Sequence, residues 1–300
     1  MPFFTQAKQI SKDTLRFLKE DEPIVYCAAI AFFTIFSLPA ILIVVVLIGS
    51  LFFSEEDVRS EILNQVSQNV NEEASQQVKE VLENALDLPG QIWWIIVGIL
   101  VIIKSATMIF FILQKALNAI WKVDVKKNVN YFRLMKHRSI TLAFVGGLGL
   151  LLIISIMADA FINFFGDEIG FLWEGFPKPI TRIGGLAFNL LMVFIFFAAI
   201  HKTLPDVIIS WKDALVGGAI TAILFMIGKE VISLILNNIK IEGYYATAGS
   251  LVILLLWVFY SSIILYLGAE ITRAYSNSHG RKTKPTSIAF KYSEKNKREV

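Results

Sequence analysis

Long apolar runs that carry almost no charge constrain this chain more than any other feature. A helix needs about 20 apolar residues to cross the roughly 30 Å of hydrocarbon in a bilayer. Strands of a membrane barrel would instead alternate polar and apolar residues over about ten positions, which these runs do not do. The sequence therefore predicts an all-α, polytopic membrane protein with six transmembrane helices. The runs cover about 23–54, 92–113, 139–158, 183–200, 214–236 and 247–269.

The distribution of positive charge predicts the orientation of these helices. Lys and Arg together number 4 before the first run, then 2, 7, 2, 2 and 1 in the five successive loops, and 8 after the last run. Because segments rich in Lys and Arg stay in the cytoplasm, both ends of the chain, the second loop and the weakly basic fourth loop are expected inside. The first loop has nine acids against Arg59 and Lys79, so it is expected outside.

The segments that flank the runs have their own character. In the N-terminal segment Ile10, Leu15 and Leu18 fall near one helical face, which is typical of a helix at the cytoplasmic membrane surface. The first apolar run is too long for a cleavable signal peptide and is expected to stay as an anchor. The C-terminal segment is basic and poor in apolar residues, so we expect disorder and a topology signal rather than nucleic-acid binding. The predicted parts are an amphipathic segment 1–22, a membrane domain 23–275 and a tail 276–300.

The first loop, 55–90, is the only sizeable one expected outside. Apolar residues recur there every four positions from Val58 to Val70, and a helical spacing continues at Val78 and Leu82. The pattern predicts two short amphipathic helices, closed by the turn signal Leu88-Pro89-Gly90. Two interpretations follow for this loop. It is a lid on the outer face of the bundle, or it is a surface for gating or for a partner.

Motifs for enzyme chemistry are absent from the sequence. The one cysteine, Cys27, lies inside the first run, and His137, His201 and His279 are far apart, so neither a disulfide nor a metal signature is present. The chain also lacks a phosphate-binding Gly-Lys-Ser/Thr loop and a Gly-x-Ser-x-Gly elbow. We therefore expect no metal, no cofactor and no enzymatic activity. Cys27 is expected to be a small apolar residue that either faces lipid or packs inside the bundle.

Charged residues at membrane depth are the candidate functional residues. Such groups are costly in hydrocarbon and usually face a protein interior or a wet cavity. Lys104 lies about 12 residues, or roughly 18 Å, inside the second run, near the midplane. It either snorkels towards an interface or meets a water-filled cavity or an anionic ligand. The pair Lys229 and Glu230 lies in the outer half of the fifth run, and Asp159 and Glu270 are boundary charges.

Glycine pairs in the third and fifth runs indicate close helix packing. Small residues let two membrane helices approach each other. Gly217 and Gly218 in the fifth run are therefore expected to pack against a neighbouring helix, in preference to forming a hinge.

Several short blocks of sequence carry a family resemblance. In this order and spacing they resemble the YihY/virulence factor BrkB family of bacterial inner-membrane proteins, formerly labelled ribonuclease BN. The resemblance implies a multi-pass protein of the bacterial inner membrane. Transport-like roles, including lipid or ion movement, have been suggested for members of the family, which has no settled biochemical activity. The blocks are Ala28-Ala29-Ile30-Ala31-Phe32-Phe33-Thr34-Ile35-Phe36-Ser37-Leu38-Pro39, Ala116-Leu117-Asn118-Ala119-Ile120-Trp121, Leu204-Pro205-Asp206, Trp211-Lys212-Asp213-Ala214, Ala248-Gly249-Ser250-Leu251-Val252 and Leu267-Gly268-Ala269-Glu270.

Three hypotheses about function remain open at this stage. The first is a permease-like or flippase-like protein for a small or anionic amphipathic solute, with Lys104 in a central cavity and Lys229 nearer the outer mouth. The second is an envelope scaffold that binds a partner, or a second copy of itself, through the loop 55–90. The third is the ribonuclease of the former label, which we disfavour because phosphodiester hydrolysis needs a clustered metal site. Membrane lipids are the expected partners, without nucleic acid.

Overall fold

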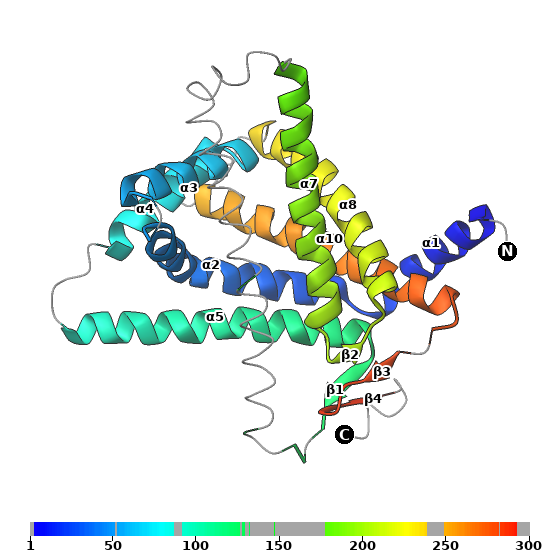
Figure 1. Cartoon of the computed structure of the whole chain (residues 1–300). Coiled ribbons are helices and arrows are strands. Elements are labelled where there is room, and N and C mark those ends of the chain that lie inside the picture. The colour runs from blue at the N-terminus through cyan, green and yellow to red at the C-terminus, as the bar shows by residue number, and fades with distance from the viewer. Residues whose placement is uncertain are drawn as a thin grey trace.

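The computed structural model places long helices where the apolar runs lie (Figure 1). The third predicted run, apart from Gly147, and Asp159 lie outside the described residues. The described residues are 3–51, 53–86, 92–126, 128–129, 132, 147, 178–238, 249–281 and 283–292. The helices are α1 (Phe3–Glu20), α2 (Pro23–Gly49), α3 (Glu55–Asn69), α4 (Glu72–Leu86), α5 (Ile92–Ile120), α7 (Lys178–Thr203), α8 (Trp211–Asn238) and α10 (Gly249–Ser278). The short strands are β1 (Val123–Val125), β2 (Val207–Ile208), β3 (Lys284–Pro285) and β4 (Ala289–Lys291).

The longest helices have the dimensions of membrane spans. By length and hydropathy, Trp211–Leu236 and Gly249–Ser278 can each cross a membrane, and α1 from Lys8 with α2 to Pro39 passes as a third span that is bent by 69°. These spans are the ones found within the part of the chain that the structure describes. At 1.5 Å per residue the 30 residues of α10 extend for about 45 Å. The fold is therefore an all-α membrane bundle.

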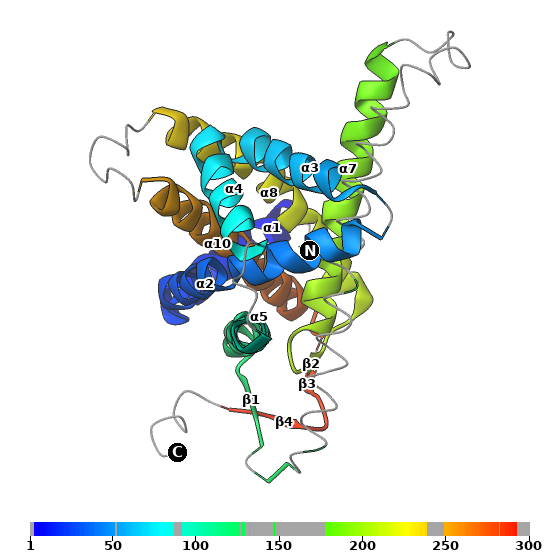
Figure 2. The same ribbon diagram turned by 90° about the vertical axis from the view of Figure 1, so that its left-hand side faces the viewer.

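The bundle has two distinct ends. Helices α2, α5 and α10 run alongside one another, and α8 packs between α7 and α10 (Figure 1). Figure 2 looks along the axis of α5 and shows α3 and α4 lying across the other helices. We call the end formed by α3 and α4 the hairpin end. The opposite end, which carries β1 to β4, is called the strand end.

The hairpin end agrees with the two helices predicted from the periodicity. The Ser54 hydroxyl accepts a hydrogen bond from the Asp57 amide at 3.1 Å, and Asn71 Oδ1 accepts one from the Ala74 amide at 2.9 Å. Both are helix caps. The apolar face of the hairpin is buried against α2, α8 and α10 in one cluster. That cluster contains Leu42, Val46, Val58, Val70, Ala74, Val78, Leu82, Leu236, Ile253 and Leu254.

Glycines set the close packing of α8. A Cβ atom on Gly217 would lie 1.7 Å from Thr272 Oγ1 of α10, and one on Gly218 would lie 2.6 Å from the backbone of Ala198 in α7. Neither contact leaves room for a side chain. The predicted role of this glycine pair in helix packing is therefore confirmed.

The strand end contains structure where the sequence predicted disorder. Residues of the tail continue α10 to Ser278 and then form β3 and β4, and Ile288 and Ala289 are buried. Strand β4 pairs antiparallel with β1, and β3 pairs with β2. These strands are too short to give a period-2 pattern, which explains why the composition suggested disorder. Residues beyond Tyr292 lie outside the described part.

Candidate functional site

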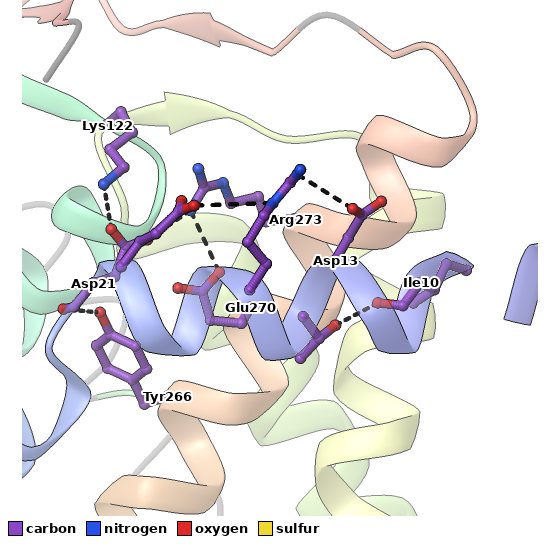
Figure 3. Close-up of polar contacts among 10 residues, drawn as sticks. Ile10, Asp13, Asp21, Lys122, Tyr266, Glu270 and Arg273 are labelled. Carbon is purple, nitrogen blue, oxygen red and sulfur yellow. Dashed lines mark hydrogen bonds and ion pairs between the residues drawn. The ribbon is translucent and has the colours of Figure 1, made fainter. Parts of the chain in front are cut away.

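A cluster of four charged side chains lies at the strand end (Figure 3). Asp21, in the turn between α1 and α2, pairs with Lys122 Nζ through Oδ1 and with Arg273 Nη1 through Oδ2 at 2.7 Å. The same Nη1 atom lies 3.5 Å from Glu270 Oε2, and both carboxylates are buried. The Tyr266 hydroxyl donates to the Asp21 carbonyl at 3.0 Å. We call Asp21, Lys122, Glu270 and Arg273 the charge cluster.

Local backbone geometry brings the members of the charge cluster together. Glu22 precedes Pro23 and has φ 47°, so α1 ends there and α2 begins at a proline suited to a first turn. Lys122 has φ 52°, a left-handed conformation that ends α5 and turns the chain into β1. Arg273 also lies over the Phe17 ring, 3.9 Å from its centroid. The cluster thus joins the ends of α1 and α5 to α10 through two basic and two acidic side chains.

A second polar arrangement joins α5 to the loop between α7 and α8. The buried carboxylate of Asp206 accepts hydrogen bonds from Asn118 Nδ2 at 2.7 Å and from Gln114 Nε2 at 3.3 Å. Asn118 Oδ1 in turn accepts one from the Asp206 amide at 2.7 Å, and Gln114 also donates to the Leu204 carbonyl at 3.2 Å. A reciprocal contact of this kind fixes the position of the loop on the helix.

A cavity of about 240 Å³ lies beside these groups. We call it the polar pocket. Burial raises the pKa of the Tyr292 phenol, partly offset by Lys122, so this group stays protonated at neutral pH. The described lining of the pocket therefore offers two carboxylates, one amine, two amides and two phenols within a membrane protein. Its described lining residues are Tyr26, Phe111, Gln114, Lys115, Asn118, Ala119, Val123, Asp124, Val125, Asp206 and Tyr292.

The candidate residues from the sequence lie apart from one another. Lys104 is exposed on α5 and has no ion pair among the described residues. On α8, Lys229 Nζ lies 3.7 Å from the exposed Glu230 and donates to Asn69 of α3 at 3.4 Å, which joins this pair to the hairpin end. Glu270 belongs to the charge cluster.

Sequence reasoning missed most residues of the charge cluster and the polar pocket. Glu270 was identified only as a boundary charge, although Arg273 follows it at the i+3 spacing that allows a pair on one helix face. Asp21 carried only a weak signal, as an acid two positions before the proline that starts the first run. Asp206 was present in a family block but without an assigned partner.

The His and Cys side chains of the described residues lie apart from one another and are packed in the bundle or engaged in hydrogen bonds. The described part of the chain contains no group of three or more His, Cys, Asp or Glu side chains arranged to hold a metal ion. His201 is buried, with Nε2 lying 3.0 Å from Thr221 Oγ1. Because the Thr221 hydroxyl donates to the Gly217 carbonyl at 2.7 Å, the His201 ring must donate to Thr221. Cys27 is buried in the core of the strand end, as its predicted packing role requires.

The apolar helices and the polar groups gathered at one end define a membrane protein. The chain belongs to the Virulence factor BrkB family, whose sequence model matches residues 14–289. The resemblance inferred from the sequence blocks is therefore confirmed. No solved structure is significantly similar to this chain.

Three relatives show the extent of the similarity. A UPF0761 membrane protein of Psychrobacter sp. (strain PRwf-1) is 24% identical over 82% of this chain and 44% of its own length. UPF0761 membrane proteins of Janthinobacterium sp. (strain Marseille) and Cronobacter sakazakii (strain ATCC BAA-894) are 25% and 26% identical over 59% of this chain. The matches cover 39% and 57% of those two proteins. The chain therefore spans less than two thirds of these relatives.

Proposed function

We propose that the chain crosses the bacterial inner membrane six times, with the strand end and both termini in the cytoplasm. Five of the six apolar runs coincide with α2, α5, α7, α8 and α10, and the distribution of Lys and Arg supports the orientation. The acidic hairpin end then lies outside.

Cysteine labelling tests this orientation. In a Cys27→Ala background, Glu83→Cys and Lys284→Cys place single thiols at exposed positions of the two ends. A membrane-impermeant maleimide added to intact spheroplasts should label the variant at 83 and leave the variant at 284 unlabelled until the membrane is opened. Labelling of the variant at 284 in intact spheroplasts would contradict the orientation.

Within this topology we propose a permease-like or flippase-like activity on a small or anionic amphipathic solute. The polar pocket carries the proposal, because a cavity lined by charges and amides at the end of an apolar helix bundle suits solute binding. Lys104 would meet negative charge midway along α5, and Lys229 with Glu230 would lie nearer the outer side. The proposed activity requires no enzymatic chemistry, metal or cofactor.

Liposome reconstitution tests the activity and the role of Lys104. The wild-type protein should move an anionic amphipathic reporter faster than empty liposomes do, and Lys104→Met should slow this movement. Lys79→Met, at an exposed position of the hairpin end, is the matched control. Equal rates for the wild type and Lys104→Met would remove Lys104 from the mechanism, and no movement above empty liposomes would refute the activity.

An envelope scaffold is the second candidate function. The exposed acids of the hairpin, such as Glu56, Glu72 and Glu83, favour it because they form a polar surface away from the bundle. Pull-down with and without residues 55–90 would test it, and changing these acids to Gln avoids exposing the buried apolar face. Loss of a defined partner or of a homo-oligomer would support the scaffold.

The ribonuclease activity of the former family label is not part of our proposal. An assay of purified protein with labelled RNA and divalent metal ions decides the matter. Cleavage above a mock preparation would contradict the proposal that the chain is not an enzyme.

A further inference from the structure

One face of α5 leads along the helix into the polar pocket. Lys104, Thr107, Phe111 and Lys115 follow one another at intervals of three or four residues, which places them on one side of the helix. All four are exposed in the described structure, whereas Asn118, at the end of the same side, is buried in the pocket wall. We call this side the α5 face. It extends for about 21 Å from Lys104 to Asn118 at 1.5 Å per residue.

The α5 face has both apolar and polar parts. Met108 and Phe111 expose 42% and 36% of their surface, which is contact area for acyl chains. The apolar run of α5 ends at Leu113, and Gln114 and Lys115 come next. Because about 20 apolar residues span the hydrocarbon, these two polar residues lie at the level of lipid headgroups. A lipid against α5 would therefore place its headgroup at the mouth of the polar pocket.

The charges in the pocket suit a zwitterionic headgroup with a primary amine. Lys115 is exposed and has no ion pair among the residues described, so its amine can bind a phosphate. The buried Asp206 contributes one carboxylate to the pocket wall, where it accepts hydrogen bonds from Gln114 and Asn118. Asp124, on β1, adds a second carboxylate, and the Tyr26 ring can contact a cation. A primary ammonium can donate N–H hydrogen bonds to these carboxylates, whereas a quaternary ammonium has no N–H group to donate.

We propose that the polar pocket binds the headgroup of a phospholipid that carries a primary amine, such as phosphatidylethanolamine. The phosphate binds Lys115, the ammonium donates to Asp124, and the acyl chains lie along Met108 and Phe111. This proposal deepens the proposed function by naming the class of solute, and it rests on the same orientation of the strand end. Lys104 would contact the phosphate of a lipid deeper along the α5 face.

Lipid binding can be measured without transport. The purified protein would be studied by native mass spectrometry with equal amounts of phosphatidylethanolamine, phosphatidylcholine and phosphatidylglycerol of matched chains. We expect phosphatidylethanolamine to bind most tightly. Lys115→Met and Asp124→Asn should each weaken its binding by about tenfold, the usual effect of losing a hydrogen bond to a charged group. Lys79→Met, far from the pocket on α4, should leave binding unchanged.

Other results would overturn the proposal. Equal retention of the three lipids, with no effect of either variant, would mean that only unspecific surface lipid is bound. Tighter binding of phosphatidylglycerol would indicate that the pocket binds an anionic headgroup instead of a zwitterionic one. A separate titration with soluble glycerophosphoethanolamine distinguishes the source of the headgroup, because binding as tight as that of the lipid would indicate a soluble phosphoester. If the protein bound phosphatidylethanolamine selectively but moved no reporter across liposomes, the proposed transport function would be refuted. The proposed binding site would still be supported.

Discussion

Replacement of Arg273 by methionine should destabilise the protein more than almost any other substitution of a largely buried residue at the strand end. Arg273 contacts Asp21 at 2.7 Å and Glu270 at 3.5 Å through one nitrogen, and its side chain is only 13% exposed. Methionine keeps an unbranched apolar stem over Phe17 and removes only the charge and its donors. Glu270, which is fully buried, would then lose its cation.

The expected loss follows from the balance of the charge cluster. Two acids and two bases become two acids and Lys122 alone, so one buried carboxyl group must either keep its charge without a partner or take up a proton. Removing one partner of a buried pair costs about 3–5 kcal/mol. Arg16→Met is the matched control, because Arg16 pairs with Asp13 at 3.2 Å while its side chain stays 60% exposed. Exposed pairs contribute about 0–1 kcal/mol.

Reversible unfolding in mixed detergent micelles measures the two losses. A second variant makes the test independent of general damage: Glu270→Gln in the Arg273→Met background removes the uncompensated charge and should recover part of the stability. The double-mutant cycle should give a coupling of at least about 1 kcal/mol between the two positions. A loss for Arg273→Met no larger than that for Arg16→Met would refute the reasoning that this cluster is buried and balanced.

Two further predictions concern packing and the tail. Gly218→Ala should destabilise the bundle by about 1–3 kcal/mol because its Cβ would meet the backbone of Ala198. Gly228→Ala should cost less, because its Cβ meets only the ends of the Tyr260 and Ile264 side chains. Unfolding midpoints in detergent compare the two variants, and equal midpoints would contradict the prediction. Arg281→Gln removes the cation that pairs with the buried carboxylate of Asp213 and should cost about 1–3 kcal/mol, less than Arg273 because Arg281 is partly exposed. Limited proteolysis should then cut the tail after α10 sooner than in the wild type, and an unchanged rate would count against this tether.

Local sequence patterns predicted the elements whose stability depends on local features. Apolar runs fix long helices because each backbone group in hydrocarbon must bond within its own segment. The four-residue spacing from Val58 to Val70 predicted the hairpin because the same residues form its buried face. In the structure Asn71 caps the second helix of the hairpin through its own side chain, which is again a local contact.

Contacts between distant segments could not be read in this way. Asp21 and Arg273 are 252 positions apart in sequence, and Asp206 meets Asn118 across 88 positions. Neither pair follows from periodicity or charge counts, because the meeting depends on how α5 and α10 are placed by the whole bundle. The tail was misread for the same reason. Strands β3 and β4 pair with strands in the loops that follow α5 and α7. The amino-acid composition of the tail does not indicate these partners.

The charge cluster and the polar pocket are connected through packed side chains. Two kinds of variant can nevertheless distinguish their roles. Tyr26 lines the pocket, and its ring stacks on Tyr266 with centroids 6.3 Å apart. The Tyr266 hydroxyl in turn donates to the Asp21 carbonyl. A change that disrupts the charge cluster should therefore weaken lipid binding together with stability. Lys115→Met should weaken binding alone, because Lys115 is exposed and supports no packing. If both variants lowered binding only in proportion to stability, the pocket would be a consequence of the fold and not a binding site.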